Sequence, residues 1–398
     1  MKLKKKVLFM LSSINIGGVE KSLLSLLSVI PKEKYDITIL VLEKKGGFLE
    51  YIPNWVKMEE TAWFKDVKPI IMQPPQQTIK DYYINKSYTK ILTFLCSYFI
   101  SKQFNNRYLY YKEVFKNVPI NTNTYDVAIA FQGPTDMIDY YIANKVKATK
   151  KISWVHFDVS KHFINEKLYN RLYKSFNKIF VVSKEARKCL IEKVPTVERK
   201  VEVLLNIVPN DLINYMSKET MEFDEGYKGT KIVTVGRLSR EKGQDIAIKV
   251  LSRLRKDGYD VRWYCVGDGN YRKKFETLIE EYGLKEDFIL LGAKSNPYPY
   301  MAEADIYVQT SRHEGYCLTL AEAKCLAKPI VTTNFIGAYE QIEDGNTGFI
   351  VGCNEEEVYI KIKYLLDNKI VQDMLHENLS NSNFDTKEEI KKLYDFIN

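Results

Sequence analysis

Short apolar runs rich in β-branched residues alternate with helical patterns along most of the chain. Residues 6–13 (KVLFMLSS) and 35–43 (YDITILVLE) have the continuous apolar character of buried strands, and leucines recur at helical spacing between them. The same alternation returns at YDVAIAFQG, KKISWVHFD and KIFVVSKEARKCLIEK. Continuous apolar strands separated by amphipathic helices are typical of a parallel sheet covered by helices.

The pattern starts afresh in the second half of the chain. A strand over 231–235, a polar loop, a helix through about Arg255 and a strand over 261–266 form a new strand–helix–strand unit. Two such units predict an α/β protein of two doubly wound, Rossmann-like parallel-sheet domains with a ligand cleft between them. The expected boundaries are an N-terminal domain at 1–209, a polar linker at 210–229, a second domain at 230–380 and a C-terminal helix at 381–398 that returns to the first domain.

The segment 80–116 departs from this alternation, because it is dense in tyrosine, phenylalanine and lysine. Its apolar residues recur at helical spacing, at Tyr88, Ile91, Leu92, Leu95 and Phe99. Two interpretations stay open. Aromatic and basic residues on a helix suit the surface of an anionic membrane, and the same spacing suits a helical hairpin that packs onto the first domain.

Composition narrows the class of protein. Of 398 residues, 45% are hydrophobic and 28% charged, which excludes a disordered chain, and no apolar run is long enough to span a membrane. The basic N-terminus resembles a signal peptide, but its short apolar part and the absence of a cleavage site favour a buried first strand. Six scattered cysteines without a C-x-x-C motif indicate a reducing cytoplasm, with neither a disulfide framework nor a zinc site.

The net charge and the motifs of the chain indicate which ligands and cofactors to expect. The net charge of +8 favours anionic partners, but no nucleic-acid recognition motif accompanies the lysines. No dinucleotide fingerprint G-x-G-x-x-G is present, which disfavours a nicotinamide enzyme. No metal-ligand spacing appears either, so we expect a metal-independent site without a cofactor.

Two glutamates stand out in SRHEGYCLTLAEAK (311–324). Gly315 indicates a loop between the predicted strand ADIYVQT and a predicted helix. Glu314 is therefore expected in that loop, at the carboxyl end of the strand, and Glu322 in the first turn of the helix. Open α/β sheets bind ligands at that edge. The alternatives are a solvated loop acid for Glu314 and a capping box with Thr319 for Glu322.

Basic residues and glycines supply three candidate anion contacts. Arg237 ends the predicted strand in TVGRL, and Lys242 stands just before the next helix. Bases at the carboxyl end of a strand, beside helix N-terminal amides, suit a diphosphate. Gly17 and Gly18 follow the first strand and allow an anion to approach the backbone closely.

One histidine joins these candidates. His156 ends a predicted strand of the first domain and is therefore expected at its ligand-binding edge, although lone histidines are often structural. His162, His313 and His376 are weaker candidates.

Together these segments resemble the retaining glycosyltransferases of family four, which have the GT-B fold. SRHEGYCLTLAE resembles their E-x7-E signature, and the match is strong over 231–351. The further matching segments, in the family's order, are GGVEKS, WVHFD, VVSKEA, VGRLSREKG, LLGAKSNPYPYMAEADIYVQTS, KPIVTTN and GNTGFIV.

The resemblance implies a role for each candidate. Arg237 and Lys242 would hold the donor's diphosphate, Glu322 the ribose hydroxyls and Glu314 the hydroxyls of the donor sugar. Gly18 would let the first helix approach the diphosphate, and His156 would face the reacting sugar. The remaining implied donor contacts are Gly17, the base-binding backbone at Ala293 and Lys294, and the phosphate-binding loop at Gly315, Tyr316 and Cys317.

The resemblance also implies a function. The expected enzyme is a cytoplasmic, metal-independent retaining glycosyltransferase, peripheral at the cell membrane if 80–116 meets lipid. It would use a nucleotide sugar, a UDP-sugar by expectation, to extend a lipid-linked or surface glycan, such as a capsule or exopolysaccharide. The alternatives are transfer to a soluble sugar or protein acceptor, a sugar-nucleotide epimerase of the same fold, and a non-catalytic binding subunit.

Overall fold

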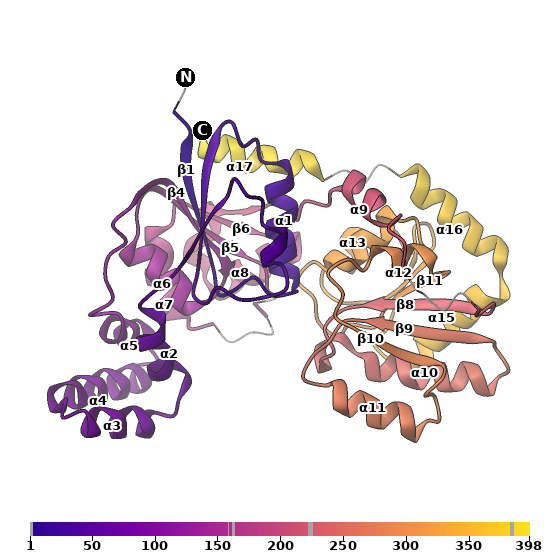
Figure 1. The fold of residues 1–398 in the computed structure, drawn as a ribbon, viewed down its shortest axis with the longest axis horizontal. Helices are drawn as coiled ribbons and strands as arrows, with labels where there is room; N and C mark the ends of the chain where they lie inside the picture. Colours follow the sequence, from indigo (N-terminus) through magenta and orange to yellow (C-terminus); the bar gives the residue numbers. More distant parts are fainter. Residues whose placement is uncertain (1–2, 158, 161–163, 222–225, 383–385) are drawn as a thin grey trace. The chain divides into compact units, whose positions relative to one another are not determined.

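The computed structural model describes residues 3–157, 159–160, 164–221, 226–382 and 386–398. The chain divides into two units, each built around one parallel sheet (Figure 1). Unit 1 comprises Met1–Asn15, Val29–Leu204 and Lys392–Asn398, and unit 2 comprises Ile16–Ser28 and Leu205–Lys391.

The sheet of unit 1 has seven strands in the order β3-β2-β1-β4-β5-β6-β7. Its order reverses between β1 and β4, the usual topology of a doubly wound sheet. Phe9, Phe131, Trp154 and Phe180 fill its core, where they meet mostly edge to face. The strands are β1 Lys5–Leu11, β2 Tyr35–Val41, β3 Lys57–Glu60, β4 Thr124–Gly133, β5 Lys147–Val155, β6 Lys178–Val181 and β7 Val201–Val203.

Side-chain caps open the helices α5, α7 and α8 of unit 1. Asn165 accepts a hydrogen bond from the backbone amide of Leu168 (3.0 Å) to open α7, and Ser183 accepts one from Ala186 (3.0 Å) to open α8. The helices are α2 Phe64–Met72, α3 Pro75–Ile84, α4 Tyr88–Gln103, α5 Arg107–Val114, α6 Asp136–Lys145, α7 Glu166–Leu172, α8 Lys184–Lys193 and α17 Ile390–Ile397, with short 3-10 turns η1 Leu49–Tyr51, η2 Tyr173–Ser175 and η3 Pro195–Lys200. The turn η5 Lys387–Glu389, just before α17, belongs to unit 2.

The sheet of unit 2 has six strands in the order β10-β9-β8-β11-β12-β13, which reverses between β8 and β11. Trp263 is fully buried in its core and donates its indole N–H to Thr234 Oγ1 at 2.9 Å. The strands are β8 Thr230–Val235, β9 Val261–Val266, β10 Phe288–Gly292, β11 Ile306–Gln309, β12 Ile330–Thr333 and β13 Phe349–Val351. The helices are α1 Gly18–Val29, α9 Asn210–Met216, η4 Arg240–Lys242, α10 Gln244–Lys256, α11 Arg272–Glu281, α12 Tyr298–Glu303, α13 Leu318–Cys325, α14 Ala338–Gln341, α15 Glu355–Asp367 and α16 Lys369–Asn381.

This architecture confirms the predicted fold class, two Rossmann-like parallel sheets covered by helices. Two details concern the ends of the units. The start of the expected linker forms helix α9, where Asn210 accepts a hydrogen bond from the thiol of Cys325 at 2.8 Å. Residues 392–398 belong to unit 1, where Lys5 donates to the carbonyl of Ile397 at 2.9 Å and the rings of Tyr35 and Tyr394 stack.

The aromatic segment 80–116 lies in the helices α3, α4 and α5 (Figure 1), and its aromatic side chains divide into a buried set and an exposed set. Phe94 is buried against the rings of Tyr82, Tyr98 and Tyr110. The apolar row expected from the spacing is largely not core, because three of its members are exposed to solvent. The large exposed hydrophobic residues of this segment are Tyr83, Ile84, Tyr88, Leu92, Phe99, Ile100 and Phe104.

Among the described residues, no helix combines the length and the apolar character needed to cross a membrane.

Candidate functional site

The candidate site of unit 2 lies where the strand order of the sheet reverses. Strands β8 and β11 are hydrogen-bonded neighbours and run parallel, so the loops that follow them emerge at the same edge. Arg237 and Lys242 lie in the loop after β8, and Glu314 lies in the loop after β11. Topology therefore brings together residues more than seventy positions apart, at the point where open α/β sheets bind ligands.

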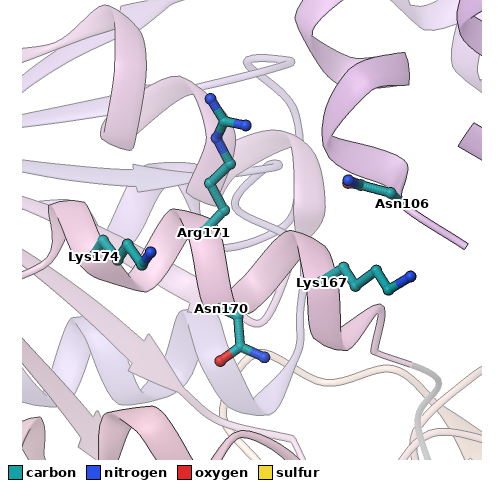
Figure 2. A pocket seen from close by; sticks show the side chains of 5 residues that line it. All are labelled: Asn106, Lys167, Asn170, Arg171 and Lys174. Carbon is teal, nitrogen blue, oxygen red and sulfur yellow. The ribbon is translucent and has the colours of Figure 1, made fainter. Parts of the chain in front are cut away.

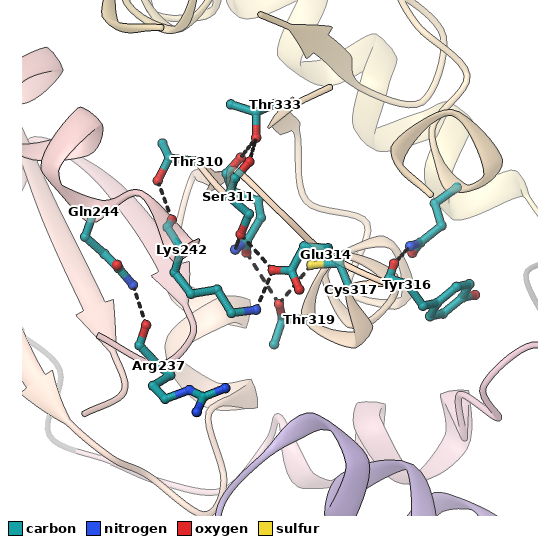
Figure 3. A network of polar contacts seen from close by, with 12 residues as sticks. Arg237, Lys242, Gln244, Thr310, Ser311, Glu314, Tyr316, Cys317, Thr319 and Thr333 are labelled. Carbon is teal, nitrogen blue, oxygen red and sulfur yellow. Dashed lines mark hydrogen bonds and ion pairs between the residues drawn. The ribbon is translucent and has the colours of Figure 1, made fainter. Parts of the chain in front are cut away.

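Lys242 and Glu314 form an ion pair between these two loops (Figure 3). The side chain of Glu314 is only 11% exposed, so the alternative of a solvated loop acid is wrong. Burial works against the charged amine, but the carboxylate of Glu314 raises the pKa of Lys242 above its ordinary value. Lys242 is therefore held as a cation at neutral pH.

A row of polar side chains positions Glu314. Ser311 donates to Glu314 Oε1 at 2.7 Å, Gln309 donates to Ser311 Oγ at 2.7 Å, and Tyr307 donates to Gln309 Oε1 at 2.6 Å. Tyr307, Gln309 and Ser311 are all fully buried. Because each of these buried polar groups has a hydrogen-bond partner, the row holds the carboxylate of Glu314 in place from the side of β11, as Figure 3 shows in part.

Further hydrogen bonds join the loop after β11 to the loop after β8 and to the start of α10. Thr310 donates its hydroxyl to the carbonyl of Lys242 at 3.1 Å, and Arg312 makes two hydrogen bonds to Asp245, at 2.8 and 2.7 Å. Gly243 has φ +69°, and a Cβ at this position would lie 2.1 Å from the carbonyl oxygen of Thr310. Only glycine fits that contact, so the sequence K-G before α10 is needed for the loops to meet.

Arg237 presents its side chain to solvent beside this pair. Its backbone carbonyl accepts a hydrogen bond from Gln244 Nε2 at 3.0 Å, which fixes where the side chain departs. The guanidinium forms no ion pair with any residue that the structure describes, and Figure 3 shows it pointing away from the network. Arg237 is thus available to an anion from outside, next to the cation of Lys242.

Glu322 lies in the second turn of α13 and is 3% exposed. Its carboxylate pairs with Lys21 of α1, at 2.8 Å to Oε1, and accepts a hydrogen bond from the hydroxyl of Tyr298 at 3.2 Å. The capping-box alternative is wrong, because α13 begins after Cys317 without a side-chain cap and the hydroxyl of Thr319 points to Gln309. Glu322 is a buried acid that two side chains from other helices hold in place.

The loop from Gly315 to Cys317 leads into α13 with an unusual backbone. Cys317 has φ +65° and is buried, and the carbonyl of Tyr316 accepts a hydrogen bond from Gln341 Nε2. Burial, with the negative charge of Glu314, raises the pKa of Cys317 to about 12. The thiol therefore stays protonated and is a poor nucleophile at neutral pH.

The glycines at the start of α1 leave its N-terminus open. A Cβ on Gly18 would meet nothing within 4 Å, whereas one on Gly17 would lie 2.5 Å from Glu20 Oε2. Glu20 is 7% exposed, and burial raises its pKa to about 7 against the opposing effects of its own backbone amide and of Arg237. Open space over Gly18 is compatible with close approach of an anion to the helix.

Ala293 and Lys294 follow β10 at the same edge of the sheet, and both are exposed. Strand β9 separates β10 from β8, and the ammonium of Lys294 lies 5.9 Å from the centre of the Tyr300 ring. No contact joins these two residues to Lys242, Glu314 or Glu322 among the interactions that the structure describes.

His156 lies in unit 1, directly after β5. Its ring stacks on Trp154 and contacts Phe131, with centroids 5.8 and 4.7 Å apart, and burial lowers its pKa to about 3. Its Nε2 is buried without a hydrogen-bond partner among the described residues. The imidazole is therefore neutral and has one nitrogen left for a ligand.

The weaker histidine candidates have no comparable setting. His313 is exposed, and His376 bonds through Nδ1 to the carbonyl oxygen of Ala327 at 2.7 Å. His162 lies outside the described residues. Within the described ranges, no three His, Cys, Asp or Glu side chains gather in a way that could hold a metal ion.

Sequence reasoning missed several residues of the site. Lys21 and Tyr298 pair with Glu322, and Gln309 and Ser311 support Glu314. One signal was present: Lys21 stands three positions after Gly18 in GGVEKS, a segment in which only the glycines drew attention. Tyr298, Gln309 and Ser311 lie in or next to mainly apolar segments, and the sequence around a single polar residue there does not indicate which residue it contacts.

Comparison with known proteins places this geometry in context. Residues 217–382 match the family model described as glycosyl transferases group 1. A stretch of 207 residues is 30% identical to the Campylobacter jejuni N-acetylgalactosamine-N,N'-diacetylbacillosaminyl-diphospho-undecaprenol 4-alpha-N-acetylgalactosaminyltransferase, covering 52% of this chain and 55% of that protein. The chain spans about half the length of the curated relatives it matches first.

Solved structures match over nearly the whole chain. The HepE protein of Anabaena in complex with UDP and glucose has a TM-score of 0.71 at 17% identity, over 99% of both chains. A TarM variant of Staphylococcus aureus, in complex with fondaparinux, alpha-GlcNAc-glycerol and UDP, has a TM-score of 0.70 at 14% identity, over 99% of this chain and 100% of that one. At these identities the likeness concerns the fold, and it confirms the expected GT-B architecture.

Proposed function

We propose that this chain, whose residues 217–382 match the family model described as glycosyl transferases group 1, moves a sugar from a nucleotide sugar to a glycan acceptor. The observation that carries the proposal is the partly buried pair of Lys242 and Glu314 at the reversal point of the second sheet, with Arg237 beside it. A cation held next to a carboxylate suits a ligand that presents a diphosphate and sugar hydroxyls together.

The proposed mechanism follows the charge that develops during transfer. As the bond between sugar and diphosphate breaks, negative charge grows on the departing phosphate. Lys242 stays protonated, and together with Arg237 it would stabilise that charge, at about 3 kcal/mol for each contact by analogy with an oxyanion hole. Glu314 would accept hydrogen bonds from the sugar hydroxyls, and Glu322 from those of the ribose.

We propose transfer with retention and without a metal ion. In front-face attack, the departing phosphate accepts the proton of the acceptor hydroxyl, so the protein needs no base and no nucleophile of its own. Cys317 is a poor nucleophile because its thiol stays protonated, and the carboxylates of Glu314 and Glu322 are both engaged by cations. The lysine and arginine charges would take the part that a divalent cation plays in other phosphate sites.

The donor we propose is a UDP-sugar, and the acceptor is a lipid-linked or surface glycan of the cell envelope. Support for the donor comes from the HepE and TarM structures, whose complexes contain UDP. Support for the acceptor comes from the name of the Campylobacter jejuni relative, which specifies a diphospho-undecaprenol. Other relatives are named for colanic acid and capsular polysaccharide biosynthesis.

We further propose that the chain works in the cytoplasm, peripherally at an anionic membrane, which helices α3 and α4 contact. The exposed side chains Tyr88 (58%), Leu92 (66%) and Phe99 (62%) lie among lysines on these helices, a combination suited to the lipid headgroup region. Replacing these three by serine is expected to weaken co-sedimentation with anionic vesicles, whereas serine at Tyr215, exposed at 72% in unit 2, should not. Unchanged co-sedimentation of the triple variant would end this part of the proposal.

Binding of nucleotide sugars tests the main proposal. The purified chain is titrated with UDP-, GDP- and ADP-sugars in the presence of a chelator, and release of nucleotide and transfer products are followed. One nucleotide should bind in preference to the others, and Glu322→Ala should weaken that binding by about tenfold or more, because a buried acceptor of two hydroxyl hydrogen bonds is lost. Glu303→Ala, in the same unit, is the matched control.

The other outcomes separate the remaining functions. Conversion of the UDP-sugar without an acceptor would identify an epimerase, and binding without any turnover would identify a non-catalytic subunit. Equal affinity of wild type and Glu322→Ala for every nucleotide would contradict the proposed donor site.

A further inference from the structure

A basic surface cavity lies in unit 1, and none of its lining residues belongs to the strands of the sheet. It has a volume of about 500 Å³ and is lined by Asn106, Lys167, Asn170, Arg171 and Lys174, none of them acidic (Figure 2). Cavities of this volume are large enough for a small organic ligand.

One helical face supplies most of the lining. Lys167, Asn170, Arg171 and Lys174 are spaced by three, one and three residues along α7 and the turn η2 that continues it, so their side chains share one side. The fifth residue, Asn106, is the N-cap of α5, where its Oδ1 accepts a hydrogen bond from the amide of Tyr108 at 3.2 Å. Two elements from separate parts of the unit thus converge on the cavity.

The positive charge of this cavity has no counter-charge. Among the described residues, Lys167, Arg171 and Lys174 form no ion pair. Lys167 donates to the carbonyl of Phe104 at 2.6 Å, and the guanidinium of Arg171 stacks on the ring of Tyr108, 3.9 Å from its centre. These contacts hold the side chains in place without neutralising them, so the cavity attracts an anion.

Amide groups supplement the cations of the cavity. The side-chain amides of Asn106 and Asn170 add donors to the three cations. Phe104, whose backbone carbonyl accepts the hydrogen bond of Lys167, directly follows α4 and is 61% exposed, and Phe99 of α4 is 62% exposed. The segment that holds Lys167 thus carries exposed aromatic side chains, which suit the apolar part of an amphiphile.

We propose that this cavity binds the phosphate group of a phosphate ester. The guanidinium fork of Arg171 and the ammonium groups of Lys167 and Lys174 match phosphate oxygens, and the two amides complete the donor set. The phosphate ester can come from a phospholipid headgroup or a lipid-linked substrate, or be a free phosphate ester, and the exposed rings nearby favour an amphiphile. The proposal is independent of the transferase activity, because it concerns binding in unit 1 alone.

The sharpest test changes charge while keeping shape. Asn170 Oδ1 accepts a hydrogen bond from the hydroxyl of Thr196 at 2.6 Å, and Asn170→Asp keeps that acceptor while placing a negative charge in the cavity. Asn117→Asp adds the same charge at an exposed position of unit 1 and serves as the control. Binding is measured by calorimetry with three probes: inorganic pyrophosphate, short-chain phosphatidylglycerol below its micelle concentration, and vesicles of phosphatidylcholine with or without phosphatidylglycerol. Saturating UDP is present throughout, so that phosphate contacts in unit 2 are occupied.

Asn170→Asp is expected to weaken binding of each phosphate probe by about tenfold, and Asn117→Asp by less than about twofold. A preference for the short-chain lipid and the anionic vesicles over pyrophosphate identifies an amphiphile, and equal affinity identifies the phosphate group alone as the ligand. Equal binding by Asn170→Asp and wild type, or no binding of any probe in the millimolar range, would overturn the proposal.

A second pair of variants guards against a local effect of the aspartate. Lys167→Gln with Lys174→Gln removes two charges while leaving Arg171 stacked on Tyr108, and Lys32→Gln with Lys34→Gln removes two exposed charges elsewhere in unit 1. Only the first double variant should weaken phosphate binding. Equal weakening by both double variants would show that binding depends on the net charge of the protein and not on the cavity, which would overturn the proposal.

Discussion

The two sheets share one topology, yet their carboxyl edges differ in polarity. In each sheet the strand order reverses once, between β1 and β4 in unit 1 and between β8 and β11 in unit 2. The edge of the second sheet carries Lys242 and Glu314 as a partly buried ion pair supported by polar side chains. The edge of the first carries His156, neutral and stacked among aromatic rings.

This difference reflects what each proposed ligand demands. A nucleotide diphosphate imposes fixed charges and hydroxyls, so the loops that hold it need particular residues at particular positions. An acceptor glycan is chemically diverse and uncharged at its reacting hydroxyl, which leaves the corresponding edge freer to vary. The matched family region, residues 217–382, accordingly lies in the charged unit.

Each unit also contains a buried carboxyl group whose pKa is raised to about 7, and the larger effect is expected in unit 1. Burial raises the pKa of Asp139 from 3.8 to about 7, although hydrogen bonds from Thr135 and Ser153 oppose that shift. Because the folded pKa lies above the unfolded one, this contribution to stability is complete at low pH and is lost as pH rises through about 7. The free energy of unfolding of unit 1 should therefore fall by about 4 kcal/mol from this group between about pH 4 and pH 8.

Asp139→Asn should remove that part of the pH dependence. Urea unfolding followed by tryptophan fluorescence measures it, since three of the four tryptophans lie in unit 1. The same pH slope in variant and wild type would mean that Asp139 is ionised in the folded protein.

Glu20 is the smaller counterpart in unit 2. Burial raises its pKa from 4.5 to about 7, and the positive charge of Arg237 opposes the shift. Stability from this group is likewise lost as pH rises from about 4.5 to about 7, by about 3 kcal/mol in total, and Glu20→Gln should abolish the loss. The fluorescence of Trp263, the tryptophan of unit 2, reports the transition, and an unchanged slope would contradict the expectation.

Lys242→Ala addresses the charged edge directly. Turnover should fall by about a hundredfold or more, equivalent to about 2.7 kcal/mol, because the ammonium is needed most when the diphosphate departs. Unfolding of the variant checks that the fold survives, and Lys256→Ala, an exposed position at the other end of α10, is the control. Wild-type turnover in Lys242→Ala would remove the proposed role.

Much of this molecule follows from its sequence, because strands and loops carry local signals. Continuous apolar runs marked the main strands, and Gly315 before an alanine-rich run placed Glu314 in a loop and the helix start near Leu318 or Thr319, where α13 begins at Leu318. Once the strands were known to be parallel, it also followed that Arg237, Lys242 and Glu314 meet at one edge.

Contacts between distant elements carried no local signal. Lys21 and Glu322 are separated by 301 positions, and no motif in either segment indicates that the two residues pair. Thr319 and Glu322 have the spacing of a capping box, which would make Thr319 the N-cap. The N-cap of α13 is instead Cys317, two residues earlier, whose backbone has a positive φ. The spacing of apolar residues in α4 likewise could not tell a buried face from an exposed one, since both have the same period.

His156→Gln should have the smallest effect and bears most directly on the uncharged edge. A neutral imidazole with pKa about 3 can accept or donate one hydrogen bond through Nε2, and glutamine offers an amide in its place. Turnover should fall by about tenfold or less, with nucleotide affinity unchanged, because the proposed nucleotide contacts lie in unit 2. The pH profile between about pH 5 and pH 8 should keep its shape, since a group that titrates near pH 3 changes no charge there. A new limb in that profile, or a loss comparable to that of Lys242→Ala, would show that the first sheet's edge carries charge during catalysis and that the two edges are more alike than their resting structures are.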